Sequence, residues 1–454
     1  MNMDKFDWRV VLALATSSML LQQALAYVCQ IVMPFLADRI AEEFGISRAW
    51  LGLYLFIQNI AAIAAAMGCG ALIVKLGPLR ISQICLIFMG GSLFVIATGM
   101  LWLYPVAAIL LGAASVSTPA SSHILARFCP PRLAPLIFSV KQTGVPVGAL
   151  IGGLLIPALL GLGLYSATLR QSIHLDAFGT SFVCGLLVYS VALMLQPLRA
   201  HFDSDRKPDT KFSVSGAAQT MRIVVHDAKL RDLAFLSFAL GGLQSIWSGF
   251  FILFLIDRLD YTELEAGTAF AIASVTAIFA RILWGYLGST ILSPRLVLGT
   301  LCVFAAVSAI LTGFYGSGWS LNAIIAVAIV YNITSLSWHG VLLAETARLA
   351  PEGHVGGITG GVLAFTSVAM MIYPAIYGGL LAITDSYGVG FILAAGPAMF
   401  CAIVFYNEPL EGSWTGTILR GLGWVLHPAR LAAFCLLTLA SVAGAAVLVY
   451  RGLV

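Results

Sequence analysis

Twelve apolar runs, each about as long as a bilayer-spanning helix, constrain this chain more than any other feature of its sequence. A spanning helix needs roughly 20 apolar residues, whereas a spanning β-strand needs only about 10. Hydrocarbon offers the backbone no hydrogen-bond partners, so a helix must satisfy its own peptide groups. The sequence therefore predicts membrane helices at 9–36, 48–74, 79–98, 101–126, 136–162, 178–195, 232–256, 266–289, 296–314, 319–347, 355–383 and 388–406.

The composition excludes a soluble globular protein. Of the 454 residues, 60% are hydrophobic and only 10% are charged, which is far from the usual balance. The net charge of +4 is small for this length and indicates no nucleic-acid partner. The eight cysteines are scattered without any C-x-x-C pair, so we interpret them as small buried hydrophobes and expect no metal and no cofactor.

The helices fall into two groups of six, which predicts an all-α integral membrane protein with two lobes. The lobes are 1–195 and 232–406, and the charged stretch 196–231 between them is predicted to be an exposed cytoplasmic linker. The extension 407–454 contains a further uncharged run, 431–450, which is long enough to be a thirteenth membrane helix.

Basic residues indicate the orientation, because Lys and Arg are retained on the cytoplasmic side. With the N-terminus in the cytoplasm, all but five of the 24 Lys and Arg lie at cytoplasmic segments or helix ends; the five are Arg39, Arg48, Arg170, Arg258 and Arg451. We therefore expect a multi-pass protein of the cell membrane, the inner membrane in a bacterium.

The start of the chain has an alternative interpretation as a cleaved signal peptide. Lys5 and Arg9 precede an apolar stretch that ends in QQALA, which resembles a cleavage site. Cleavage would remove the first helix and leave an odd number of spans, so we favour an uncleaved first helix.

Two short patterns recur at nearly equal spacing, which indicates a duplicated six-helix unit. Gly70, Leu72 and Arg80 recur at one constant offset as Gly285, Leu287 and Arg295. Ala126-Arg127-x-x-Pro130 recurs at a nearly identical offset as Ala347-Arg348-x-x-Pro351. Both patterns fall at equivalent cytoplasmic joints between helices.

The first of these joints resembles the loop signature G-x-L-x-D-R-x-G-R-R of the major facilitator superfamily. Gly70, Leu72, Lys75 and Gly77 match, whereas Val74 stands at the position of the acid. The run SSHILARFCPPRLAPLIFSVKQTGVPVG resembles a group of bacterial permeases, and its KQTGVPVGALIGGLLIP portion is similar to the fifth helix of the superfamily. The resemblance covers about residues 9–406.

This resemblance implies that helices 1, 4, 7 and 10 surround a central cavity, with helices 2, 5, 8 and 11 beside them and helices 3, 6, 9 and 12 outside. Large amides are costly in lipid, so they should face the bundle interior. Hydrogen bonding between helices is the alternative role for each of these side chains. The predicted cavity residues are Gln23, Tyr27, Gln30, Gln58, Asn59, Ser122, His123, Gln142, Gln244, Trp247, Asn332, Trp338 and His339.

Five charged residues form a predicted cytoplasmic gate: Arg127, Lys141, Arg281, Glu345 and Arg348. Each can extend toward the nearby interface, so none alone indicates a binding site. One hypothesis pairs Glu345 with Arg127 or Lys141 across the lobes when the inner side closes. The alternative is a local pair with Arg348, three residues along the helix.

These observations predict a gradient-driven secondary transporter that works by alternating access. No nucleotide-binding or hydrolase motif is present, so we expect no enzyme activity. A carrier-derived sensor or scaffold without transport, and a membrane-embedded enzyme or pore, are the alternatives. We expect a monomer that binds a small neutral or anionic organic solute, with a proton or another ion for coupling.

Overall fold

The computed structural model describes residues 7–46, 50–161, 163–166, 171–210, 214–316 and 318–406. Twelve helical segments in this part of the chain are long and apolar enough to cross a membrane. The predicted all-α membrane architecture is therefore confirmed. The predicted extension 407–454, with its helix at 431–450, lies outside the described residues.

The first lobe contains six spans, and three short 3₁₀ segments (η2, η3 and η4) lie beside or within them. Its elements are α1 (Trp8–Phe44), α2 (Trp50–Leu76), α3 (Pro78–Ala97), η2 (Leu101–Leu103), α4 (Tyr104–Ala113), η3 (Ala114–Val116), α5 (Ser117–Phe128), η4 (Pro131–Leu133), α6 (Ala134–Gln142), α7 (Gly144–Gly161) and α8 (Ala177–Met194).

The second lobe also contains six spans, preceded by the linker. The linker elements are η5 (Gln196–Leu198), α9 (Arg199–Phe202) and α10 (Val214–His226). The lobe itself consists of α11 (Ala228–Leu259), α12 (Glu263–Thr290), α13 (Pro294–Gly313), α14 (Leu321–Ser335), α15 (His339–Leu349), α16 (Val355–Thr384) and α17 (Tyr387–Tyr406).

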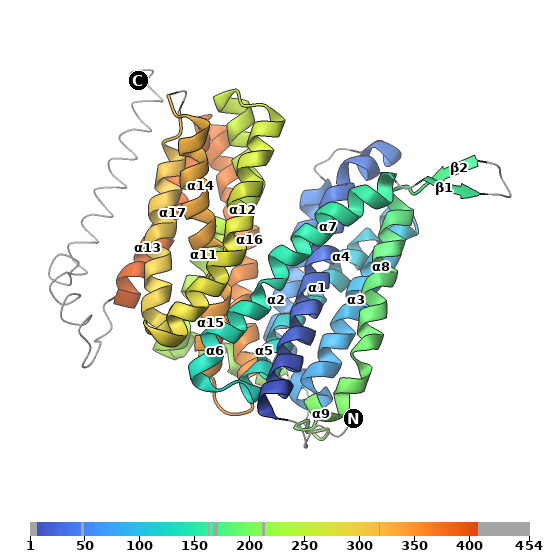
Figure 1. The fold of residues 1–454 in the computed structure, drawn as a ribbon, viewed down its shortest axis with the longest axis vertical. Helices are drawn as coiled ribbons and strands as arrows, with labels where there is room; N and C mark the ends of the chain where they lie inside the picture. The colour runs from blue at the N-terminus through green and yellow to red at the C-terminus, as the bar shows by residue number, and fades with distance from the viewer. Residues whose placement is uncertain are drawn as a thin grey trace.

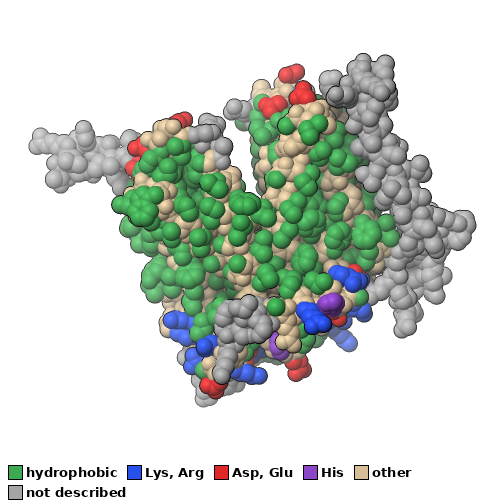
Figure 2. Space-filling model, turned by 180° about the vertical axis from the view of Figure 1, so that it is seen from behind, with side chains coloured by type: hydrophobic (Ala, Val, Ile, Leu, Met, Phe, Trp, Pro, Cys, Tyr) green, Lys and Arg blue, Asp and Glu red, His purple; other side chains and the backbone are tan. Residues whose placement is uncertain are grey.

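Each lobe has its own hydrophobic core, and the two lobes meet at one end of the molecule. The buried cluster around Met33 and Leu86 belongs to the first lobe except for Leu343 and Ala344 of α15, and the cluster around Leu240 and Phe391 belongs to the second lobe. Figure 1 shows the lobes in contact near α5, α6 and α15 and diverging toward the other end. A notch between the lobes opens at that diverging end in Figure 2.

The surface has an apolar belt between two polar ends. Large hydrophobic side chains such as Leu53, Leu154 and Phe279 are exposed along the helices, as expected for a face that contacts lipid. Lys and Arg side chains gather where the lobes meet (Figure 2). We call this the basic end and its opposite the open end.

Three spans are broken near their middles, where the sequence predicts continuous helices. The fourth span is interrupted by η3, the fifth at Thr143 between α6 and α7, and the tenth between Ser335 and His339. Irregular backbone is tolerated at membrane depth only where protein buries it or where it lines a cavity. The breaks therefore mark the bundle interior.

The predicted linker is more structured than its charged sequence indicates. Phe202 is buried, and the carboxylate of Asp203 accepts hydrogen bonds from the backbone N–H groups of Leu79 (2.7 Å) and Arg80 (3.2 Å). It thus caps α3, whose start at Gly77-Pro78 has no local side-chain cap. Helix α10 packs on α2, α11 and α16.

Two further boundaries differ from the sequence prediction. Helix α1 continues beyond 36 to Phe44, and ends at Gly45 in the left-handed conformation that glycine adopts without strain. Between α7 and α8 the chain forms an antiparallel hairpin of β1 (Gly163–Ser166) and β2 (Gln171–His174), with Gly163 opposite His174. It is the only sheet among the described residues.

Glycines allow the lobes to approach closely at the basic end. A Cβ added to Gly70 of α2 would lie 2.9 Å from the Cα of Gly357 in α16. A Cβ on Gly285 of α12 would lie 2.6 Å from Ser139 Oγ in α6. Gly70 and Gly285 are the first residues of the repeated pattern, so both copies contribute to the contact between lobes.

Candidate functional site

The polar centre of the molecule is built around Lys141, near the break in the fifth span. Its side chain is 1% exposed, and its Nζ donates to Gln23 Oε1 at 2.6 Å. The same oxygen accepts from Thr118 Oγ1 at 3.2 Å. Gln23 was predicted to face the cavity, and it joins α1, α5 and α6 in one polar cluster.

Arg281 of α12 lies at the contact between the two lobes. Its Nε and Nη2 donate to the carbonyl oxygen of Leu336 at 3.1 and 2.8 Å, and its Nη1 donates to the carbonyl oxygen of Gln142 in the first lobe. Both carbonyl groups are at helix ends, where they receive no hydrogen bond from an N–H group of their own helix. The hydrogen-bond acceptors of this guanidinium are therefore carbonyl oxygens at the breaks in the fifth and tenth spans.

In this structure the side chains of Lys141 and Arg281 are buried and bond within the protein, rather than extending toward the membrane surface. The basic end of the span is at Pro131 for Lys141 and at Thr290 for Arg281. His339 is similarly placed relative to Leu349. Arg281 lies nine residues from that end of its span, and Lys141 and His339 lie ten, which corresponds to about 14–15 Å along the helix.

His339 completes this group on the side of the tenth span. Its ring stacks on buried Trp338 with centroids 3.7 Å apart, and its Nδ1 has no hydrogen-bond partner among the described residues. It lies within electrostatic range of both Arg281 and Lys141, and partly exposed Tyr27 lies within range of Arg281. We call Gln23, Lys141, Arg281 and His339 the mid-depth cluster.

No described carboxylate forms a salt bridge with Lys141 or Arg281. Their partners are an amide oxygen and backbone carbonyls, which carry only partial charge. A buried cation without an opposite charge is costly. A negatively charged group beside the mid-depth cluster would lower this cost.

Several predicted cavity residues belong to the packing within a lobe instead. Trp247 is fully buried and stacks on Phe251 and Tyr331, with centroids 3.8 and 4.7 Å apart, in the aromatic core of the second lobe. Asn59 and Asn332 donate to carbonyls of their own helices, at Leu55 and Ala328. These side chains satisfy local needs, as the alternative interpretation allowed.

The remaining predicted cavity residues do not belong to the mid-depth cluster. Gln30 is partly exposed on α1, and Gln142 is buried and contributes its backbone carbonyl. Each of three others has a buried side-chain oxygen that lacks a hydrogen-bond partner among the described residues: Gln58, Ser122 and Gln244.

His123 lies at the basic end, not beside the mid-depth cluster. It is little more than one helical turn from the end of its span at Phe128. Its Nε2 is 3.1 Å from Asp205 Oδ2, and Arg127 Nη1 is 2.8 Å from Asp205 Oδ1. Partial burial raises the pKa of Asp205, but the hydrogen bond with His123 and the charge of Arg127 outweigh it and hold that pKa below its usual range.

The predicted pair between Glu345 and the first lobe is not formed in this structure. Glu345 accepts two hydrogen bonds from Arg348, at 2.8 and 2.7 Å, while Arg127 pairs with Asp205 and Lys141 with Gln23. The lobes are nonetheless closed at the basic end. The local pair wins because a three-residue helical spacing already aligns the two side chains.

Sequence reasoning missed two aspartates and one glutamine. Asp203 and Asp205 lie in the charged linker, where nothing in the sequence distinguishes a docked carboxylate from a solvated one. Gln22 is fully buried, and neither of its side-chain polar atoms has a partner among the described residues. Its neighbour Gln23 lies on the predicted polar stripe, whereas Gln22 does not.

Comparisons with known proteins agree with this architecture. The human organic anion transporter MFSD10 (TETRAN) aligns with a TM-score of 0.69 and 14% identity, over 86% of this chain and 98% of that one. The E. coli transporter FucP in its outward conformation aligns with a TM-score of 0.68 and 16% identity, over 86% and 98%. A bacterial homologue of the iron transporter ferroportin, in an outward-facing state, aligns with a TM-score of 0.66 and 14% identity, over 86% of this chain and 98% of that one.

At these identities the structural likenesses show the fold alone. No curated protein matches the sequence. The family model of the Major Facilitator Superfamily matches residues 18–344, which is well over half of the chain. With twelve membrane-length helices in two lobes, the chain is a multi-pass membrane transporter that belongs to the Major Facilitator Superfamily.

Proposed function

We propose that this protein moves a small organic anion across the membrane by alternating access, and that the mid-depth cluster binds the anion. The observation that carries the proposal is the burial of Lys141 and Arg281 within their spans without a carboxylate partner among the described residues. A substrate carboxylate or phosphate would supply the missing negative charge. Charge-assisted hydrogen bonds of this kind contribute about 1.5–3 kcal/mol each.

The lobe arrangement supports alternating access. The described inter-lobe contacts, such as Arg281 with Gln142 and Leu136 N–H with Ser289 Oγ at 3.0 Å, lie toward the basic end. If the basic end is cytoplasmic, as the distribution of Lys and Arg favours, the structure corresponds to an outward-open state. Breaking these contacts and closing the opposite end would expose the cluster to the cytoplasm.

The name of one structural neighbour agrees with an anionic substrate, and the name of another agrees with coupling to a proton. MFSD10 is described as an organic anion transporter, and FucP as a fucose:proton symporter. A proton taken up with the anion would offset its charge, and His339 is the imidazole nearest to the bound anion in this proposal. The alternative function as a sensor predicts binding of the same ligand without transport.

The test uses purified protein and a panel of organic anions and matched neutral solutes. A bound anion should raise the melting temperature, and Lys141→Gln should weaken its binding about 10- to 150-fold, the loss of one charge-assisted hydrogen bond. Lys75→Gln is the control, because Lys75 is exposed at the basic end, away from the cluster.

Uptake into proteoliposomes then separates the functions. A carrier should accumulate the stabilising anion, and Lys141→Gln should abolish this uptake. Stabilisation by neutral solutes only, unchanged by Lys141→Gln, would refute the anion site. Binding without any uptake or exchange would favour the sensor.

A further inference from the structure

A pocket with a volume of about 700 Å³ lies at the basic end of the molecule. Its lining comes from α2, α5 and the linker in the first half of the chain, and from loop 352–354 and the first turn of α16 in the second lobe. It shares no lining residue with the mid-depth cluster. Its volume is in the range of small-molecule sites, about 300–1,000 Å³.

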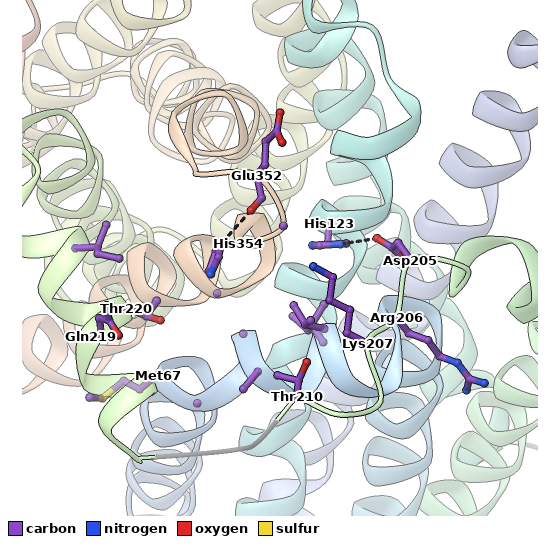
Figure 3. A pocket seen from close by; sticks show the side chains of 18 residues that line it. Met67, His123, Asp205, Arg206, Lys207, Thr210, Gln219, Thr220, Glu352 and His354 are labelled. Carbon is purple, nitrogen blue, oxygen red and sulfur yellow. Dashed lines mark hydrogen bonds and ion pairs between the residues drawn. The ribbon is translucent and has the colours of Figure 1, made fainter.

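The lining contains two acids, Asp205 and Glu352, and two bases, Arg206 and Lys207. Figure 3 shows the Lys207 ammonium and the His354 ring directed into it, whereas the side chains of Arg206 and Glu352 extend away. The ammonium of Lys207 has no hydrogen-bond or salt-bridge partner among the described residues. The remaining acid, Asp205, is already paired with His123 and Arg127.

The start of α16 adds further donors. This helix has 30 residues, and its N-cap residue, His354, makes no side-chain capping bond. The N–H groups of the first turn of a helix have no intrahelical acceptor, and the helix dipole favours an anion beside them. Gly353 and Gly357 line the pocket on each side of this N-terminus.

His123 provides an independent indication of a ligand. Its side chain is 9% exposed, and its Nδ1 has no hydrogen-bond partner among the described residues. Because Nε2 faces Asp205, the opposite edge of the ring is turned toward the side of the pocket where His354 lies (Figure 3). A protonated His123 donates through Nε2 to Asp205 and through Nδ1 toward a ligand.

Val74 also lines this pocket, at the position where the superfamily loop signature has an acid. Its carbonyl accepts the backbone N–H of Lys207 at 2.8 Å, which docks the linker against α2. The pocket therefore has cationic and N–H donors on the side where Lys207, His123 and the start of α16 lie, and its one carboxylate without a salt bridge, Glu352, is directed away from that side (Figure 3).

We propose that this pocket binds a phosphate-bearing anion between Lys207, His354, His123 and the first turn of α16, and so stabilises the arrangement closed at the basic end. The ligand would contact both lobes, which rocking would separate. A ligand that binds only the closed arrangement shifts the ratio of closed to open molecules about 100-fold at 100 times its Kd.

The first experiment measures binding of inorganic phosphate and glycerol 3-phosphate to the full chain in detergent by calorimetry, so it does not depend on transport. Binding should be saturable, and Lys207→Gln should weaken it about tenfold or more. Lys75→Gln removes an exposed charge of the same end outside the pocket and should change Kd less than twofold.

The second experiment measures the lobe arrangement with spin labels at Trp102 and Leu264, which are exposed at the open end in different lobes. Phosphate should narrow the distribution of distances between the two labels to a single population, the arrangement closed at the basic end. Val74→Asp should abolish phosphate binding yet keep that population without phosphate, because its carboxylate takes the place of the ligand.

The source of the phosphate group is separated with lipid. Nanodiscs of phosphatidylcholine with and without phosphatidylglycerol are compared, each without free phosphate. If phosphatidylglycerol shifts the label distances and soluble phosphates do not, the site binds a lipid headgroup. If soluble phosphates shift these distances, the site binds a free metabolite. The proposal would be overturned if phosphate neither bound saturably nor shifted the lobe arrangement. It would also be overturned if Lys207→Gln and Lys75→Gln lost the same amount of phosphate affinity.

Discussion

At the scale of single residues, Asp205 links the linker to the first lobe through His123 and Arg127. Its pKa in the folded protein is below the usual value near 3.9. The ion pair therefore contributes stability that is fully present above that value and is lost as the pH falls through the lower pKa of the folded state. We expect protection of the linker from proteolysis by an acid protease to decrease across this window.

Asp205→Asn should remove this part of the pH dependence, because the amide does not titrate there. Asp209→Asn serves as the control, since Asp209 is exposed in the same linker. Proteolysis rates of the three proteins between pH 5 and pH 3 give the comparison. An identical pH profile for wild type and Asp205→Asn would contradict the assignment.

Glu345 gives a second prediction at this scale. It is buried and paired with its helical neighbour Arg348, so its charge does not hold the lobes together in the closed arrangement. Glu345→Gln should therefore leave the accessibility of both ends to thiol reagents within about twofold of wild type. Increased labelling at the basic end would instead support the cross-lobe gate.

At the scale of elements, close contact between α2 and α16 keeps the basic end closed. A Cβ on Gly360 would lie 2.6 Å from the carbonyl oxygen of Ala66. Overpacking costs about 1–3 kcal/mol, so Gly360→Ala should shift the equilibrium between lobes about 5- to 150-fold toward opening at the basic end. Spin-label distances across that end measure the shift.

Gly379→Ala on the same helix is the matched control. No atom lies within 4 Å of a Cβ at this position, and both substitutions carry the same gain in helix propensity. The control should stay closed at the basic end. Equal behaviour of the two variants would show that the α2–α16 contact does not control closure.

At the scale of the whole molecule, the distribution of charge predicts the topology. The N-terminus and the linker should be cytoplasmic, and the C-terminus should be external if the run at 431–450 spans the membrane. Single cysteines at Lys75 and Asp260 should react only from the cytoplasm and only from outside, respectively. The seven native cysteines among the described residues are buried and should add little background labelling, and Cys435, which lies outside them, is replaced by Ser.

A tag at the C-terminus tests the thirteenth helix separately. It should be reached from outside only. Labelling from the cytoplasm alone would remove that helix from the membrane topology, while leaving the twelve described spans unchanged.

The sequence by itself determined the class of fold. Its helix-length apolar runs predict twelve spans in two lobes, because a spanning segment must satisfy its own backbone in hydrocarbon. The amides on one face of α1 similarly predict that Gln23 faces the bundle interior. These inferences depend on local periodicity and on the cost of exposing polar groups to lipid, so they need no tertiary contacts.

Only the tertiary structure decided which polar groups meet. Trp247 and His123 carry the same kind of signal as Gln23, yet one packs in an aromatic core and the other binds a linker carboxylate. Arg281 donates hydrogen bonds to carbonyl oxygens that are available because the helices break there, and no residue pattern predicted these breaks. Partner choice depends on how helices distant in sequence pack together, and periodicity within one helix carries no information about that packing.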